Sequence, residues 1–287
     1  MAAAKGDPYR SYLSAEEVQN THWKFGPPNY DAANKLFEEG QTKIWPAGSV
    51  EEKVQNLVKT WEMEVFNKAN PEEYKCLDPN NYTISVNGRE KQSFFFFIFF
   101  FGKLVLFNFF FLFFLRLCHL IKELSYVNDS WKTTISSGRK PLTIAEKGKL
   151  GGGYNVLLQT ELPENFRVYD PAKETTESAL KVFKTTFPRG FALEILHVYS
   201  GPPVIVYKFR HWGFMEGPFK GHSPTGELVE FFGMAIFEVD EQSNKIVKVQ
   251  FFYDPKQLLE GLVKGDKIGD ELKATASSTC PFMAASK

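Results

Sequence analysis

The chain has 287 residues, enough for one large domain or two small ones, and its 34 basic residues balance its 34 acidic residues. Because there is no net charge and no block of basic residues, binding to nucleic acid is not expected. Cys76, Cys118 and Cys280 are far apart and odd in number, so neither a disulfide framework nor a metal site is expected. The first residues lack the apolar stretch of a secretory signal, which favours a cytoplasmic protein. No cofactor is expected.

Residues 1–48 are mostly polar and are predicted to form an arm that packs on the domain. Trp23, Phe25 and Trp45 are the residues expected to hold this arm in place. Within the arm, Asp31 is positioned to cap a short helix that runs as far as Trp45.

An amphipathic helix is predicted over residues 50–68, with Ser49 as its N-cap. Its apolar residues recur at three- and four-residue spacing and would form one buried face: Val54, Leu57, Val58, Trp61 and Val65. A loop follows the helix, and residues 82–86 are predicted to form a short strand.

Residues 94–115 hold 19 apolar residues, interrupted only by Gly102, Lys103 and Asn108, which is the length of a membrane span. Insertion of the apolar residues into a bilayer would be favourable by about 6 to 11 kcal/mol, and the charge of Lys103 would offset only about 3 kcal/mol of this. However, 13 of the 21 residues from 94 to 114 are Phe. Membrane helices mix several residue types, and Phe is a mediocre helix former, so the composition argues against an evolved membrane helix.

A T-rich noncoding tract read in frame would also produce this run, because Phe is encoded by TTT or TTC. If residues 89–138 are removed, the flanks join as YTISVNGRKPLTIAEK, an Asn-Gly turn that leads into a capped helix. We therefore hypothesise that residues 89–138 are an extraneous insertion, from a retained intron or a gene-model error. A real membrane anchor through residues 94–115 and a genuine core segment are the alternatives.

Helices are predicted on the downstream side of the Phe-rich run as well. Thr143 and Glu146 form a capping box that opens one helix, which the glycine-rich residues 148–153 break. Another helix is predicted over residues 178–187, where Pro-Arg-Gly ends it.

The last third of the chain changes to strand patterns rich in branched and aromatic residues. Four strands are predicted: residues 191–199, 204–212, 229–239 and 245–253. Along the second of these, His211 shares one face with Tyr207 and Phe209, and the opposite face carries Arg210 and Trp212. Asp254 and Pro255 then open a closing helix.

This order predicts an α+β fold, in which a curved antiparallel sheet wraps around the N-terminal helices and leaves a pocket on its concave side. Residues 49–88 and 139–265 would form this single domain. Residues 266–287 would form a flexible tail.

Several long blocks in order resemble the plant pathogen-related proteins, a family of stress-associated proteins. Among them are NTHWKFGPPNYDAANKLFEE, FPRGFALEILHVYSGPP and KFRHWGFMEGPFKGHSPTGE. The resemblance covers nearly the whole chain except residues 89–138. That family is in turn similar to the SnoaL-like branch of the nuclear-transport-factor-two-like fold. The resemblance implies a cone of curved sheet and helices around a pocket, often in homodimers.

The SnoaL-like cyclases use an Asp as acid and base near the end of the last strand, and Asp254 matches that position. Asp254 followed by Pro255 is also an ordinary helix cap. Where those cyclases have a pocket His, this chain has Met215, which cannot carry a proton. The other candidates for the pocket wall are Trp61, Tyr199, Tyr207, Arg210, Trp212, His222 and Tyr253.

The sequence therefore favours a stress-associated protein that binds a small apolar ligand or a protein partner without catalysis. A cyclase or isomerase that uses Asp254 is the first alternative. A form anchored in a membrane through residues 94–115 is the second.

Overall fold

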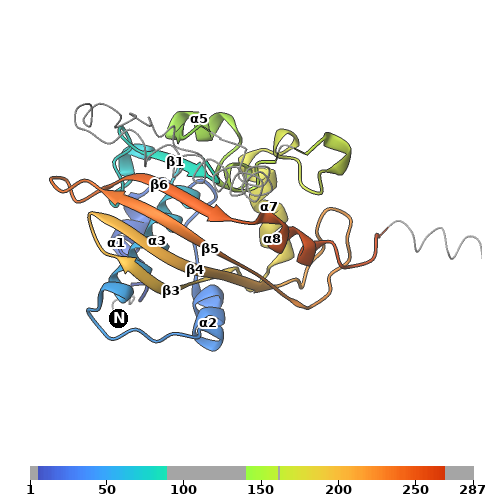
Figure 1. Cartoon of the computed structure of the whole chain (residues 1–287), viewed down its shortest axis with the longest axis horizontal. Coiled ribbons are helices and arrows are strands. Elements are labelled where there is room, and N and C mark those ends of the chain that lie inside the picture. Colours follow the sequence, from blue (N-terminus) through green and yellow to red (C-terminus); the bar gives the residue numbers. More distant parts are fainter. Residues whose placement is uncertain (1–5, 89–139, 161, 269–287) are drawn as a thin grey trace, which may run out of the picture. The chain divides into compact units, whose positions relative to one another are not determined.

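The computed structural model describes residues 6–88, 140–160 and 162–268 (Figure 1). By its internal contacts the chain divides into two units, residues 1–86 with 142–287 and residues 87–141, and the elements below belong to the first. The Phe-rich run and most of the predicted tail lie outside the described residues, so the expectations for them stay predictions.

The helices are α1 (Ala15–Asn20), α2 (Asp31–Gly40), α3 (Val50–Asn67), α5 (Ile144–Lys149), α6 (Gly153–Leu157), α7 (Thr176–Thr186) and α8 (Pro255–Leu262). The strands are β1 (Thr83–Val86), β2 (Leu142–Thr143), β3 (Ala192–Ser200), β4 (Val204–Phe214), β5 (Leu228–Val239) and β6 (Ile246–Tyr253). In the described ranges, no helix combines the length and the apolar character needed to cross a bilayer.

One six-stranded sheet with the order β2-β1-β6-β5-β4-β3 forms the centre of the fold (Figure 1). The predicted antiparallel meander from β3 to β6 is confirmed, and so is the mixed helix and sheet class. The strand predicted at residues 82–86 forms as β1, which pairs with β6 in parallel. A parallel pair needs a long connection, so nothing local in the sequence indicates this pairing.

Helix α3 supplies the helical side of the core. Ser49 begins it as predicted, because the Ser49 hydroxyl accepts a hydrogen bond from the Glu52 amide at 3.2 Å. The predicted apolar face packs against the sheet, with the Trp61 ring meeting Phe237 edge-on at 5.4 Å between ring centroids. Burying this face accounts for most of the stability of such a helix.

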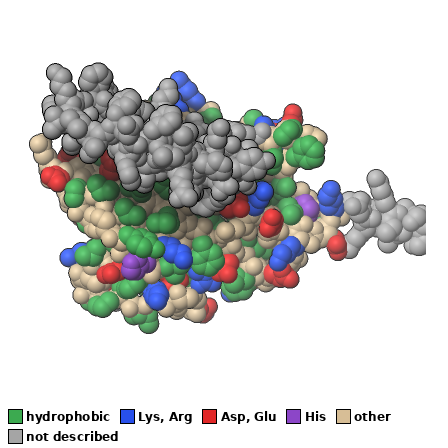
Figure 2. Space-filling view, viewed as in Figure 1, with side chains coloured by type: hydrophobic (Ala, Val, Ile, Leu, Met, Phe, Trp, Pro, Cys, Tyr) green, Lys and Arg blue, Asp and Glu red, His purple; other side chains and the backbone are tan. Residues whose placement is uncertain are grey.

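Side chains along β4 alternate between the two faces of the sheet, as predicted, and the two faces have different environments. Tyr207 and Phe209 are buried in the main core with α3. On the opposite face, the Arg210 Nε donates to Glu230 at 2.7 Å. On the side of the molecule shown in Figure 2, charged side chains of both signs are interspersed with hydrophobic ones.

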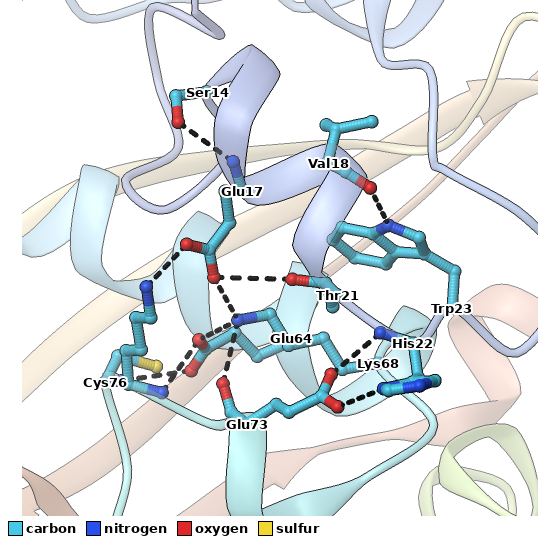
Figure 3. Close-up of polar contacts among 11 residues, drawn as sticks. Ser14, Glu17, Val18, Thr21, His22, Trp23, Glu64, Lys68, Glu73 and Cys76 are labelled. Atoms are coloured by element: carbon cyan, nitrogen blue, oxygen red, sulfur yellow. Dashed lines mark hydrogen bonds and ion pairs between the residues drawn. The ribbon is translucent and has the colours of Figure 1, made fainter.

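A buried polar network joins the N-terminal arm to α3 (Figure 3). The Lys68 Nζ donates to Glu64 at 2.9 Å, to Glu17 of α1 at 3.1 Å and to the Glu73 carbonyl at 2.9 Å. The Lys68 and Glu64 side chains are fully buried, and the second Glu64 oxygen accepts from the Cys76 amide at 3.0 Å. Burial acts to raise the pKa of Glu17, but hydrogen bonds from lysines outweigh it and lower that pKa.

Two further lysines satisfy the carbonyl end of α3. The Lys24 Nζ and the Lys147 Nζ donate to the Val65 carbonyl at 3.0 Å and 3.1 Å. Cations are favourable at this end of a helix, where the last carbonyls have no partner within the helix. Burial lowers the pKa of Lys24 to about 8 and that of Lys147 to about 7.

The prediction for α2 was wrong at both ends. Asp31 is the first helical residue instead of the cap, and its amide donates to the Asn29 side chain at 2.8 Å. The helix ends at Gly40 instead of continuing to Trp45, because the buried Glu194 carboxylate binds the next amides. It accepts from the Thr42 amide at 2.5 Å and from the Lys43 amide at 2.6 Å.

The three aromatic residues expected to hold the arm differ in their contacts. The Trp45 indole donates to the Ile195 carbonyl of β3 at 3.0 Å, whereas the Trp23 indole donates within the arm, to the Val18 carbonyl at 2.9 Å. Phe25 is 41 % exposed, so it contributes little to holding the arm.

Candidate functional site

A cavity of about 240 Å³ lies between α3, α7 and the inner face of the sheet. Its walls are mostly aromatic and aliphatic, as in typical small-molecule sites. Aromatic side chains from two helices and three strands contribute: Trp61 from α3, Phe183 from α7, Phe209 from β4, Phe231 from β5 and Phe251 from β6. Its size lies between the roughly 150 Å³ cavity that binds benzene and the roughly 300 Å³ lower end of drug-sized pockets.

Glu62 is the one carboxylate on the cavity wall among the described residues, and it comes from α3. Burial raises the pKa of its carboxyl, and the nearby Arg10 and Lys59 oppose this shift without cancelling it. Within the described part of the chain, no hydrogen bond engages the Glu62 carboxyl. The raised pKa means that this carboxyl keeps its proton to a higher pH than an ordinary glutamate does.

His211 faces the cavity from the sheet, on β4. Its ring is stacked between Phe191 and Phe231, at 5.5 Å and 5.3 Å between ring centroids, with interplanar angles of 11° and 10°. Its Nδ1 atom is buried without a hydrogen-bond partner in the described structure. Burial lowers the pKa of His211 to about 3, with the backbone of Ala192 opposing the shift, so the imidazole is neutral at pH 7.

Two of the predicted pocket residues lie on this cavity, Trp61 and Tyr253. The Trp61 indole donates to the Tyr82 hydroxyl at 3.1 Å, and the Tyr253 hydroxyl donates to the Leu157 carbonyl at 2.5 Å. These bonds fix both rings, so each presents its apolar surface to the cavity.

Tyr207 and Met215 are fully buried in the core, and neither lines the cavity. Tyr207 shares the inner face of β4 with Phe209, and its hydroxyl has no partner among the described residues. Tyr199 is 57 % exposed near the end of β3. The His222 Nδ1 lies 2.9 Å from the Gly265 carbonyl, in the connection between β4 and β5.

Arg210 and Trp212 lie on the outer face of β4, away from the cavity. The Arg210 guanidinium donates to the Gly40 carbonyl at 3.1 Å and lies 4.3 Å from the centroid of the Trp212 ring. The Trp212 ring packs against Phe37 of α2 at 6.2 Å between centroids. In this structure both residues attach α2 to the sheet.

Asp254 is the N-cap of α8, as its sequence context predicts. Its side chain accepts a hydrogen bond from the Lys256 amide at 3.0 Å. Asp254 is exposed and is not part of the cavity wall, although Tyr253 and Leu258 on either side of it are.

Sequence patterns did not predict Glu62 as a cavity residue. For His211 they predicted only the strand face that it shares with Tyr207 and Phe209. The available signal for Glu62 is its spacing: it lies four residues after Val58 and four before Phe66, both on the cavity wall. A carboxylate at such a position on an apolar helix face is a candidate for function. The described residues contain no cluster of His, Cys, Asp and Glu that could hold a metal ion.

Beside the cavity, α3 also carries Lys59, whose amine is buried among aromatic rings. The Lys59 Nζ lies 3.1 Å from the centroid of Phe37 and 4.3 Å from that of Tyr9. It is 2 % exposed and has no hydrogen-bond partner in the described structure. Burial, together with the positive charge of Arg10, lowers the pKa of Lys59 to about 6.

We expect Lys59→Met to stabilise the protein at pH 7. Native Lys59 is largely neutral at this pH, whereas the unfolded chain binds a proton up to about pH 10.5. This difference is worth at most about 5 kcal/mol at pH 7, and we expect a gain of about 2 to 4 kcal/mol. The wild-type free energy of unfolding should also rise with pH between about 6 and 10.5, and the variant should lack this rise.

Guanidinium unfolding at pH 6, 7 and 9 measures both effects. Lys53→Met, at an exposed position on the same helix, is the matched control and should change stability by less than about 0.5 kcal/mol. A Lys59→Met protein less stable than the wild type at pH 7 would show that the buried amine is stabilising.

These observations define a class of α+β protein with an aromatic cavity between helices and one face of the sheet. The chain is 43 % identical over 292 residues to the pathogen-related protein of Hordeum vulgare, covering 99 % of this chain and 98 % of that protein. It therefore belongs to the pathogen-related protein family, which confirms the resemblance noted in the sequence. No known family model matches the chain.

Solved structures with some likeness include SnoaL-like proteins. A Jannaschia sp. CCS1 protein described as a SnoaL-like polyketide cyclase is 22 % identical and has a TM-score of 0.25; the match covers 32 % of this chain and 65 % of that chain. An Acidithiobacillus ferrooxidans protein described as a polyketide cyclase is 11 % identical, with a TM-score of 0.36, and the match covers 77 % and 100 %. At these TM-scores the likeness carries no argument about activity.

Proposed function

We propose that this protein binds a small, largely apolar ligand in the cavity, as part of a cytoplasmic response to pathogens or other stress. The observation that carries the proposal is the cavity itself, with about 240 Å³ of space between mostly aromatic walls. A concave aromatic site of this volume suits a small molecule better than a protein partner. The link to pathogens rests on the name of the Hordeum vulgare relative.

The alternative of a cyclase or isomerase that uses Asp254 has less support. The Asp254 carboxylate is exposed and engaged as a helix cap, and the cavity wall does not include it. A general acid or base must reach the proton that it transfers, at about 2.6 to 3.2 Å or through one water. We therefore propose binding without catalysis by Asp254.

Filling the cavity tests the binding proposal. Val58 lies on the cavity wall in the middle of α3, and a phenylalanine there would occupy part of the free space. We expect Val58→Phe to weaken binding of the two-ring hydrocarbon tetralin by about tenfold or more, measured by ligand-observed NMR and by the rise in Tm with ligand.

Val204→Phe provides the control, because Val204 is exposed at the start of β4. This variant should bind tetralin like the wild type. If Val58→Phe is folded and binds tetralin unchanged, the ligand does not occupy this cavity.

A further inference from the structure

Polar side chains on the cavity wall gather where the N-terminal arm meets α3. Arg10, Asn29 and Tyr30 come from the arm, and Glu62 and Asn67 come from α3. Two contacts hold this group together. The Asn67 amide donates to the Tyr30 hydroxyl at 2.9 Å, and the Arg10 guanidinium lies 3.6 Å from the centroid of the Tyr30 ring. The cavity therefore has a polar end.

The rest of the wall offers a ligand almost no polar group. Aromatic rings such as Phe183 and Phe231 dominate it. His211 lies among them, but its Nδ1 atom has almost no accessible surface and its ring also bonds to the Ala192 backbone. Lys184, the other polar side chain on this part of the wall, is exposed to solvent. A ligand therefore finds its polar contacts at the polar end.

Glu62 is the group at the polar end that is free to accept a hydrogen bond. Its side chain is only partly buried, and within the described ranges no hydrogen bond reaches it. Unlike the His211 Nδ1 atom, its oxygens are not among the polar atoms without accessible surface. Arg10, in contrast, already binds Asp7 at 3.2 Å and Asn34 at 2.7 Å.

A carboxyl group accepts hydrogen bonds in both of its protonation states. The ionised form only accepts, and the protonated form keeps acceptor capacity beside its single donor. An acceptor that lacks a partner in a largely buried site is costly, so a ligand that donates to Glu62 gains affinity whichever form is present. A cationic donor is disfavoured, because the permanently charged Arg10 guanidinium lies on the same part of the wall.

We propose that the cavity takes an uncharged one- or two-ring compound with a hydroxyl group, which donates a hydrogen bond to Glu62 at the polar end. The inference rests on the proposed function and adds the chemical class of the ligand. The rings of the ligand pack against the aromatic part of the wall, where offset and edge-to-face contacts are favourable.

Four two-ring probes on one carbon skeleton test this class on the full chain: 1-tetralol, 1-tetralone, tetralin and 1-aminotetralin. The alcohol and the ketone have nearly the same shape, but only the alcohol can donate. We expect 1-tetralol to bind about tenfold more tightly than 1-tetralone or tetralin, as one hydrogen bond to a largely buried group predicts. A ketone that binds as tightly as the alcohol would overturn the inference. Tightest binding of 1-aminotetralin, a cation at pH 7, would overturn it as well.

Substitutions at Glu62 locate the effect. Glu62→Leu removes the acceptor, so the affinity for 1-tetralol should fall about tenfold, to that for tetralin, while tetralin binding stays unchanged. Glu62→Gln is the matched control, because its amide keeps an acceptor oxygen, and it should bind 1-tetralol within about threefold of the wild type. Circular dichroism and tetralin binding establish that both variants are folded with the cavity intact.

The outcomes separate the two proposals. If the wild type binds neither tetralin nor 1-tetralol, the proposed function fails and this inference fails with it. If tetralin binds and 1-tetralol binds no more tightly, the proposed function stands and the hydroxyl class fails. If a folded Glu62→Leu protein retains the tenfold preference for 1-tetralol, the assignment of Glu62 as the acceptor fails.

Discussion

A chain that lacks residues 89–138 is expected to fold into the same α+β domain and to be monodisperse without detergent. The two sides of the deleted segment are already neighbours, because β1 and β2 pair antiparallel with Ile84 opposite Leu142. In the shortened chain only residues 85–88 and 139–141, seven in all, connect this pair. Asn87 has a φ of 51°, which suits the Asn-Gly turn expected at the new junction.

The stability of the shortened domain should equal or exceed that of the full chain. The connection between Ile84 and Leu142 is 57 residues long in the full chain (85–141) and seven residues long in the shortened chain. This change is about three successive halvings of the length. Each halving lowers the entropic cost of closing a loop by about 0.6 kcal/mol, so the gain is up to about 2 kcal/mol. Size-exclusion chromatography, circular dichroism and urea unfolding of both forms measure the result.

Removal of residues 83–143 is the control deletion, because it takes β1 and β2 out of the sheet together with the insertion. That protein should be unstable or insoluble. The insertion hypothesis would be wrong if the chain without residues 89–138 were unfolded while the full chain was monodisperse only in detergent. Retention of the full chain in carbonate-extracted membranes would favour an anchor through residues 94–115 instead.

Lys68→Met is expected to destabilise the protein by about 3 to 5 kcal/mol. The substitution removes the cation that Glu64, fully buried, contacts at 2.9 Å. A buried carboxylate without its partner is much costlier than the pair is favourable. The contact with Glu17 is lost as well, so α1 should detach more easily from α3.

Two comparisons make this prediction specific. Lys75→Met removes an ion pair to the same Glu17 from a half-exposed lysine, and should cost less than about 1 kcal/mol. The double variant Glu64→Gln with Lys68→Met should lose less stability than Lys68→Met alone, since no charge is left buried. Chemical unfolding of all variants at pH 7 measures these differences. A loss below 1 kcal/mol in Lys68→Met would contradict the buried-charge argument.

Local features were determined by the sequence alone. The Ser49 cap, the apolar face of α3, the Thr143 capping box and the four strands of the meander all form where the pattern places them. The Asp254 cap does so as well. Each depends on side chains within a few residues of one another, so the sequence carries the whole signal.

Tertiary structure decided the features that join distant parts of the chain. The early end of α2 depends on Glu194, and the attachment of the arm depends on Lys68. The parallel pairing of β1 with β6 and the meeting of Glu62 and His211 at one cavity have the same origin. Periodicity shows which face a residue shares with its neighbours, but it cannot show which distant face lies opposite. Of the residues that line the candidate site, the sequence therefore predicted Trp61 and Tyr253. Its polar residues became evident only from the packing of α3 on the sheet.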